Sequence, residues 1–187
     1  VRIIPVRKTM NKTLVCTALF AALGGLSQAQ ASDAKNVILF IGDGMGPSVL
    51  TATRLFKVGE EGNLEIMSLP RSARIKTFSH DAQVTDSAPS MAAYMTGVKS
   101  NNGVISMDSD ATYESDCSQS AGKPVTTLLE LAKADGRGTG VVTSTRVTHA
   151  TPAATYAHIC KRDLEADIAA QLVPGGAGYN GALKGGL

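Results

Sequence analysis

The sequence contains no tryptophan, few aromatic residues and few charges. Of its 187 residues, 4% are Phe, Trp or Tyr and 18% are Asp, Glu, Lys or Arg. So low a content of charge excludes a disordered polyelectrolyte, and the shortage of aromatics means that the core is built from Ala, Val, Leu, Ile and Met. A formal net charge of +2 gives no support for nucleic-acid binding.

Residues 1–31 have the layout of a secretory signal peptide. They contain four basic residues and no acidic one, which leaves 14 Lys and Arg against 16 Asp and Glu in the rest of the chain. An apolar run of 14 residues, 13–26, precedes the small residues Ala29 and Ala31 of a cleavage site. This run is shorter than the about 20 residues of a membrane span. We therefore expect a periplasmic or secreted protein without a stable membrane anchor, and residues 1–9 as an over-extended start before Met10.

The three cysteines lack the spacing of a metal site. None of them forms a C-x-x-C pair, which is typical of structural zinc sites. Cys16 lies in the predicted signal peptide, so the mature chain holds Cys117 and Cys160. In an oxidising compartment the two form a disulfide if they approach each other; the sequence is equally compatible with two unpaired thiols.

Short apolar runs alternate with segments of helical spacing along the mature chain. The pattern predicts strands at residues 36–41, 74–78 and 140–143, and helices at residues 48–58, 87–96, 124–134, 152–158 and 162–173, with a polar surface excursion at residues 98–122. Such alternation predicts an α/β fold with a mainly parallel central sheet flanked by helices. Functional residues then belong on loops at the carboxyl ends of the strands.

The first candidate for chemistry is Asp43, which follows the first predicted strand inside a glycine-rich turn at residues 42–46. Glycines allow the backbone or a metal ion to approach closely, and an aspartate is a hard oxygen ligand for Mg²⁺ or Zn²⁺. An ordinary tight turn with a capping aspartate is the alternative interpretation. The spacing matches neither a P-loop nor a dinucleotide-binding motif.

The second candidate is Ser87, which follows Asp86 and stands at the start of a predicted helix. The partial positive charge of a helix N-terminus favours an anion, so a serine alkoxide, or a phosphate attached to it, is stabilised there. A plain N-capping serine is the alternative. The segment lacks the G-x-S-x-G pattern of an α/β-hydrolase.

The third candidate is the segment that follows the last predicted strand. His149 and Thr151 are two residues apart, so in an extended loop they point the same way. Arg162 offers a planar pair of donors to a phosphate. The alternatives are a histidine that caps a loop and an arginine on the surface of a helix.

The three segments resemble the alkaline phosphatase family in order and spacing. The similar stretches are residues 37–46 (VILFIGDGMG), 84–88 (VTDSA) and 148–154 (THATPAA), and the similarity runs from about Lys35 to Val173. The resemblance implies an alkaline-phosphatase-like α/β fold in a bacterial, secreted phosphomonoesterase. It also implies two Zn²⁺ and one Mg²⁺, small phosphate monoesters as substrates and a homodimer of the full-length protein.

The same resemblance implies the roles of individual residues in the reaction. Ser87 matches the nucleophile, which binds zinc and forms a phosphoserine intermediate. Arg162 matches the arginine that binds the phosphoryl oxygens, and Asp86 matches the acid that orients this arginine.

The metal ligands follow from the resemblance in the same way. Asp43 matches the aspartate that bridges one zinc and the magnesium, and Thr151 matches a hydroxyl ligand of the magnesium. His149 stands near the magnesium, where relatives carry either an aspartate or a histidine.

Most of the zinc ligands of the family are missing from the sequence. Residues 32–187 therefore correspond to the N-terminal part of a catalytic domain that is incomplete at its C-terminus, and we expect little phosphatase activity from this chain alone. Two alternative functions are a phosphodiesterase or other esterase of the same superfamily and a non-catalytic secreted binding module.

Overall fold

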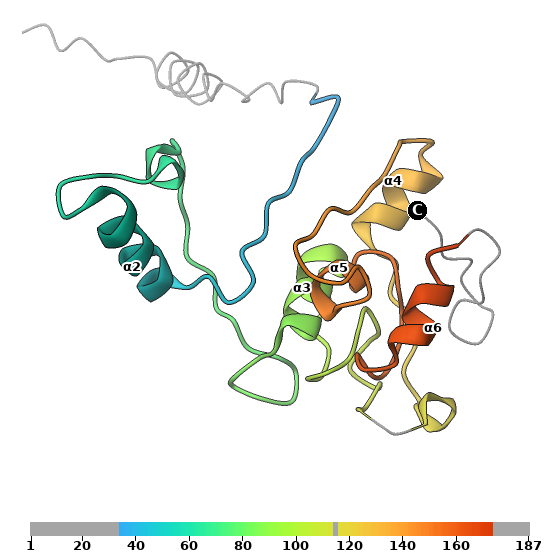
Figure 1. Ribbon diagram of the computed structural model, residues 1–187. Helices are drawn as coiled ribbons and strands as arrows, with labels where there is room; N and C mark the ends of the chain where they lie inside the picture. The colour runs from blue at the N-terminus through green and yellow to red at the C-terminus, as the bar shows by residue number, and fades with distance from the viewer. Residues whose placement is uncertain (1–33, 114–115, 174–187) are drawn as a thin grey trace, which may run out of the picture. The chain divides into compact units, whose positions relative to one another are not determined.

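The computed structural model describes residues 34–113 and 116–173 (Figure 1). The predicted signal peptide and its cleavage site lie outside the described residues. The chain divides into two compact units, residues 1–41 and residues 42–187. Only residues 34–41 of the first unit are described, and no helix in the described residues is long and apolar enough to cross a membrane.

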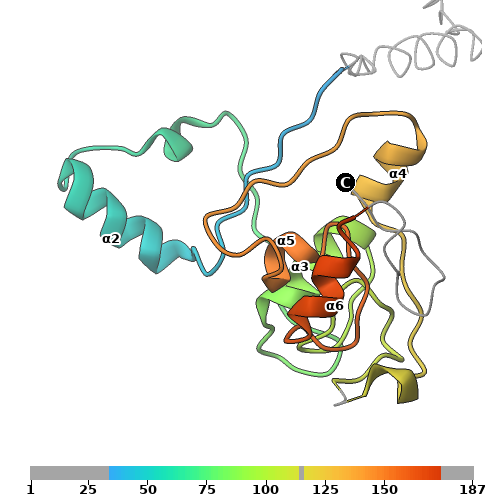
Figure 2. The ribbon, with the colours of Figure 1, turned by 45° about the vertical axis from the view of Figure 1, so that its right-hand side comes forward.

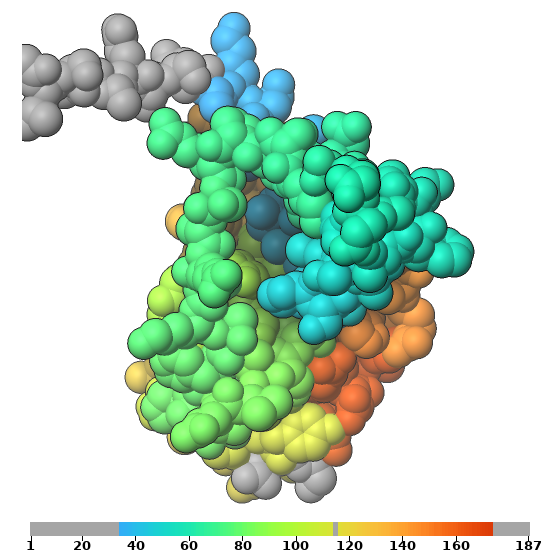
Figure 3. Space-filling model, turned by 90° about the vertical axis from the view of Figure 1, so that its left-hand side faces the viewer, coloured from blue at the N-terminus to red at the C-terminus, as the bar shows by residue number. Residues whose placement is uncertain are grey.

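The second unit contains all the described helices, and two of them occupy the predicted ranges. Helix α2 (Pro47–Val58) begins with a proline at its first turn, and helix α3 (Ser87–Thr96) ends at Gly97 in the left-handed conformation, with φ 75°. Helix α2 buries none of its residues, and Phe56 is 93% exposed. This helix is the teal segment of the face shown in Figure 3.

The other α-helices are shorter than the spacing of their apolar residues predicts. Helix α4 spans Leu128–Ala134, α5 spans Ala150–Ala153 and α6 spans Glu165–Ala170, and two 3₁₀ turns occupy Glu65–Ser68 and Cys117–Gln119. Helix α4 begins late because Thr127 and Glu130 form a capping box, in which each side chain bonds the other's backbone N–H. Residues 154–164, predicted to be mostly helical, turn instead and contribute Ile159 to an antiparallel bridge with Ile105.

The three predicted strands do not form a sheet within the described residues. Residues 36–41, 74–78 and 140–143 have no strand pairing, and Phe40 and Val142 are 89% and 101% exposed. A parallel strand is stabilised by hydrogen bonds to neighbouring strands and by cover on both faces. No described segment supplies the hydrogen bonds, and Val141, which packs against the core, is only partly buried. The pairing that the described residues do show is two isolated antiparallel bridges, Ile105 with Ile159 and Met107 with Pro124.

The core of the second unit lies between helices α3 and α5, which are side by side in both ribbon views (Figures 1 and 2). The buried side chains of this contact are mostly small: Ala88, Met91, Ala92 and Met95 from α3, and Ala150, Ala153, Ala154, Tyr156 and Ala157 from α5 and the turn that follows it. Small side chains let the helix backbones approach closely. This part of the core is therefore built mainly from alanine and methionine, in agreement with the shortage of aromatic residues in the sequence.

The prediction of a surface excursion at residues 98–122 is wrong. Ile105 and Met107 are fully buried, although polar residues surround them in the sequence. Polar side chains enter the interior because they bond backbone groups there. The buried Asn101 donates to the carbonyls of Ser109 and Ala111 at 3.0 and 2.8 Å, and Ser106 donates to the carbonyl of Ala154 at 2.6 Å. Buried polar groups with such partners cost little free energy.

The structure decides between the two alternatives for the cysteines. Cys117 and Cys160 form a disulfide with a Cα–Cα distance of 5.5 Å. Cys160 is fully buried, whereas Cys117 begins the second 3₁₀ turn. The bridge therefore joins the outer part of the segment before α4 to the core after α5.

A second buried link crosses the same region through His158. Its Nδ1 lies 2.7 Å from the carbonyl oxygen of Ser106 and its Nε2 lies 2.9 Å from Glu130 Oε1. Both ring nitrogens face acceptors, which is the arrangement of an imidazolium paired with a carboxylate. Burial alone would raise the pKa of Glu130, but hydrogen bonds from His158 and Thr127 and the charge of His158 together lower that pKa.

We expect Glu130→Gln to lower the free energy of unfolding by about 2 kcal/mol at pH 7, because the buried imidazole loses its charged partner. Glutamine still completes the capping box, so the change isolates the ion pair. The folded-state pKa of Glu130 lies below its ordinary value of 4.5. The advantage of the wild-type chain is therefore complete above that pH and disappears as the pH falls further. Urea titrations at pH 7 and at about pH 3 measure it, with the exposed Glu61→Gln as a control; an equal loss at both pH values contradicts the ion pair.

Candidate active site

Asp86 organises the N-terminus of helix α3. It is the N-cap residue, and its Oδ1 accepts a hydrogen bond of 2.7 Å from the backbone N–H of Ala88. Its Oδ2 accepts a second bond, of 2.8 Å, from the N–H of Gly103. Arg162 Nη1 lies 3.5 Å from the same carboxylate. With both oxygens engaged by donors, the carboxylate has a fixed orientation between α3 and Arg162.

Ser87 is the first residue of α3 and does not cap it, so the capping alternative for this serine is wrong. Its side chain is partly buried, and its Oγ accepts a hydrogen bond of 3.1 Å from Arg162 Nη1. The hydroxyl therefore stands at the positive end of a helix dipole and beside a guanidinium group. Both features stabilise negative charge on the serine oxygen.

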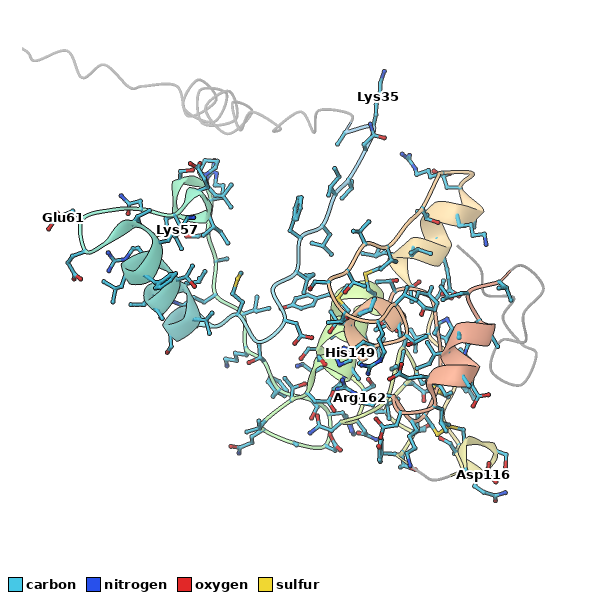
Figure 4. All side chains as sticks on the ribbon, in the orientation of Figure 1. Lys35, Lys57, Glu61, Asp116, His149 and Arg162 are labelled. Atoms are coloured by element: carbon cyan, nitrogen blue, oxygen red, sulfur yellow. A yellow bond between two sulfur atoms is a disulfide. The ribbon has the colours of Figure 1, made fainter. Side chains whose placement is uncertain are left out.

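Arg162 contacts both this serine and His149. Figure 4 shows the arginine and the histidine close together. The backbone N–H of Arg162 donates to the carbonyl of Gly103 at 2.8 Å, and its Nη2 lies 3.3 Å from His149 Nε2. A guanidinium only donates, so Nε2 is the acceptor and the proton of the imidazole is on Nδ1. That Nδ1 is buried and has no hydrogen-bond partner within the part of the chain that the structure describes.

Asp43 and Thr151 form a second group of oxygen ligands. Thr151 Oγ1 donates a hydrogen bond of 2.6 Å to Asp43 Oδ2 across 108 residues of sequence. Asp43 lies in the glycine turn, where Gly44 has φ 66°, and Thr151 lies in α5, two residues after His149. The start of α5 therefore connects the Asp43–Thr151 pair to the group formed by Ser87, Arg162 and His149.

The ligands in this region fit magnesium better than zinc. A carboxylate and a hydroxyl oxygen in contact are the kind of donors that Mg²⁺ prefers. A catalytic zinc ion takes about three protein ligands. Among residues 34–113 and 116–173 no three His, Cys, Asp or Glu side chains come together as a metal site.

An ion pair fixes the loop that leads into α5. Arg146 Nε and Nη2 donate to the carboxylate of Glu165 at 2.7 to 3.1 Å, and Thr148 Oγ1 donates to the same group. These bonds, first of all those from Arg146, lower the pKa of Glu165 to about 2. The pair is exposed and contributes little stability, but it ties residues 146–148 to helix α6.

The sequence-predicted site residues thus fall into two sets. Asp86, Ser87, His149 and Arg162 make one connected set, and Asp43 and Thr151 make the other. Sequence reasoning missed Glu165 and the turn at residues 102–103, which contacts Asp86 and Arg162. The Asn-Gly pair of that turn was a visible signal, but it indicated only a change of chain direction.

Comparison with known proteins gives a consistent result over most of the chain. The family model for alkaline phosphatase matches residues 34–182. The human tissue-nonspecific isozyme of alkaline phosphatase is 46% identical over 148 residues, which are 76% of this chain and 28% of that protein. An alkaline phosphatase from Gadus morhua is 41% identical over 167 residues, or 86% of this chain and 33% of that protein.

Solved structures agree with this result. The alkaline phosphatase of the Antarctic bacterium TAB5 superposes with a TM-score of 0.62 and 36% identity, over 72% of this chain and 35% of that one. A histidine-to-glutamate variant of the same enzyme, with Mg bound in its M3 site, gives a TM-score of 0.59 and 34% identity over the same shares of the two chains. The chain spans about a third of the length of these relatives. The similarity shows an alkaline-phosphatase-like fold of the α/β class, while the described residues of this chain contain no sheet of their own.

Proposed function

This chain belongs to the alkaline phosphatase family, and from that premise we propose that the full-length protein hydrolyses phosphate monoesters through Ser87. The observation that carries the proposal is the contact between Ser87 Oγ and Arg162 Nη1 at the N-terminus of α3. A phosphoryl group needs a nucleophile and positive charge on its oxygens at the same place. Ser87 and Arg162 provide both.

Each of these residues has a defined role in the proposed reaction. Arg162 presents a planar pair of donors to the oxygens of the substrate's phosphoryl group, and Asp86 keeps the guanidinium in place. Ser87 Oγ gives its proton to solvent water and attacks phosphorus, and the bond from phosphorus to the leaving oxygen breaks as the alcohol takes up a proton from solvent. Water then cleaves the phosphoserine, which releases inorganic phosphate and restores the hydroxyl of Ser87.

Metal ions are part of the proposal. Bound metal ions would supply positive charge that lowers the pKa of the serine hydroxyl and stabilises the leaving oxygen. Asp43 and Thr151 would hold a magnesium ion, close to His149. We propose two Zn²⁺ and one Mg²⁺ in the full-length protein, with most zinc ligands from residues other than those that the structure describes.

The proposal includes the setting of this site. The apolar segments at residues 36–41, 74–78 and 140–143 would join a mainly parallel central sheet in the full-length protein, and their exposed side chains support this. The signal-peptide layout of residues 1–31 and the disulfide support a periplasmic or secreted location. The homodimer stays a prediction from the resemblance.

The test of the function is a comparison of substrates with a search for the intermediate. We expect the full-length protein, supplied with Zn²⁺ and Mg²⁺, to hydrolyse p-nitrophenyl phosphate at least about 100-fold faster than bis(p-nitrophenyl) phosphate. Mass spectrometry after an acid quench should then find phosphate on the peptide that contains Ser87. Faster turnover of the diester would indicate a phosphodiesterase. Absence of both turnover and label would indicate a non-catalytic module.

A further inference from the structure

The turn at residues 101–103 contacts two of the three chain segments that form the connected set of site residues, those of Asp86 and Arg162. The side chain of Asn102 bonds two of the three residues that precede Ser87, Val84 and Asp86. Its Oδ1 accepts a hydrogen bond of 3.2 Å from the N–H of Asp86, and its Nδ2 donates one of 3.0 Å to the carbonyl of Val84. One partner is a donor and the other an acceptor, so the orientation of the amide is determined by its surroundings.

Asn102 is itself held firmly. Its backbone N–H donates to Asp81 Oδ1 at 3.0 Å, and the same oxygen accepts a bond of 2.8 Å from Ser79 Oγ. The neighbouring Asn101 is buried and bonds two backbone carbonyls of the core. These hydrogen bonds therefore fix the backbone from which the amide of Asn102 extends.

The backbone of Gly103 links Asp86 to Arg162. Its N–H donates to Asp86 Oδ2 and its carbonyl accepts the N–H of Arg162, both at 2.8 Å. Its φ is 78°, and a Cβ at this position would lie 2.2 Å from the ring of Tyr113. Only glycine fits there, and in this conformation the backbone of the turn meets both Asp86 and Arg162.

We propose that Asn102 is a positioning residue that fixes the start of α3 relative to Arg162. Through its amide it holds Asp86, whose carboxylate bonds Gly103 and lies beside the guanidinium of Arg162. It does not touch the serine oxygen and acts only through these neighbours. The catalytic consequence rests on the proposed function, whereas the geometric role does not.

The amide group suits this role better than its close relatives. An aspartate at position 102 would keep the acceptor for the N–H of Asp86, but it would lose the donor to Val84 and place a negative charge between Asp81 and Asp86. An alanine would remove both bonds. The three side chains therefore form a graded series.

Hydrogen exchange tests the geometric role without any assay of activity. We expect Asn102→Ala to raise the exchange rates of the amides of Asp86 and Arg162 about tenfold, the ratio expected for one ordinary hydrogen bond. The amides of Ile105 and Ile159, which bond each other's carbonyls, should keep their protection. Asn63→Ala, at an exposed position, is the matched control. Unchanged exchange at Asp86 and Arg162, or an equal rise at all four amides, would overturn the proposal.

Kinetics of the full-length protein test the consequence for the site. We expect Asn102→Ala to lower kcat/KM for p-nitrophenyl phosphate about tenfold and to raise the inhibition constant of inorganic phosphate, with metal content unchanged. Asn102→Asp should fall between alanine and the wild type. Normal kinetics with raised exchange would overturn the link to the site. If the wild-type protein hydrolyses no ester, the proposed function fails, and the exchange data alone decide the role of Asn102.

Discussion

Ser87→Ala in the full-length protein should lower the rate of phosphate-ester hydrolysis by roughly 10⁴-fold or more, the loss typical of an enzyme deprived of its nucleophile. The reason lies in the position of the hydroxyl. It stands at the N-terminus of α3 and accepts a hydrogen bond from Arg162. When it is removed, no other hydroxyl in the described residues has this position to replace it as the nucleophile. Initial rates with p-nitrophenyl phosphate measure the effect.

The fold should survive this change, because Asp86 and not Ser87 caps the helix. Binding of inorganic phosphate should also persist, since Arg162 and the helix end remain. Ser90→Ala is the matched control, because Ser90 lies one turn later in α3 and bonds Thr85 at 3.0 Å, away from Arg162. Near-normal turnover by Ser87→Ala, or an equal loss in Ser90→Ala, contradicts the assignment of the nucleophile.

The start of α3 could be predicted from the sequence because its signals are local. An aspartate, a serine, a following proline and a terminal glycine define where the helix begins and ends. The contact between Ser87 and Arg162, across 75 residues, could not be derived from such signals. It was expected only because three separate segments together resemble one family.

The pairing of the predicted strands, in contrast to the start of α3, could not be predicted from local sequence. Residues 36–41 have the apolar pattern of a buried strand, yet a pattern does not supply a neighbour to pair with. Strand formation depends on hydrogen bonds between segments, and within the described residues these segments lack them. The α/β fold is therefore established by similarity to the solved alkaline phosphatases rather than by strands in the described residues.

The buried segment at residues 104–107 could not be predicted for a different reason. Three of its four residues are apolar, but the residues on either side of it, 99–103 and 108–110, are polar or small, which is typical of a loop. The polar side chains nevertheless enter the core because they satisfy backbone groups. His158 is similar, since its buried position depends on Glu130 and on the carbonyl of Ser106, two partners far away in sequence.

Reduction of the Cys117–Cys160 disulfide should cause the largest loss of stability in this chain. The cysteines are 43 residues apart, and a crosslink over a loop of that length lowers the entropy of the unfolded chain. The stabilisation expected from this entropy is about 4 kcal/mol. Most small domains are stable by only about 5–15 kcal/mol, so the reduced chain should unfold at a much lower concentration of urea.

Urea titrations with and without a thiol reductant measure this difference, and the double variant Cys117→Ala/Cys160→Ala provides the matched control. The variant should be insensitive to the reductant and should resemble the reduced wild-type chain. Because Cys160 lies two residues before Arg162, hydrogen exchange at the amide of Arg162 should rise in both. Equal stability of the oxidised and reduced chains would show that packing around Cys160 is sufficient and that the crosslink adds nothing to it.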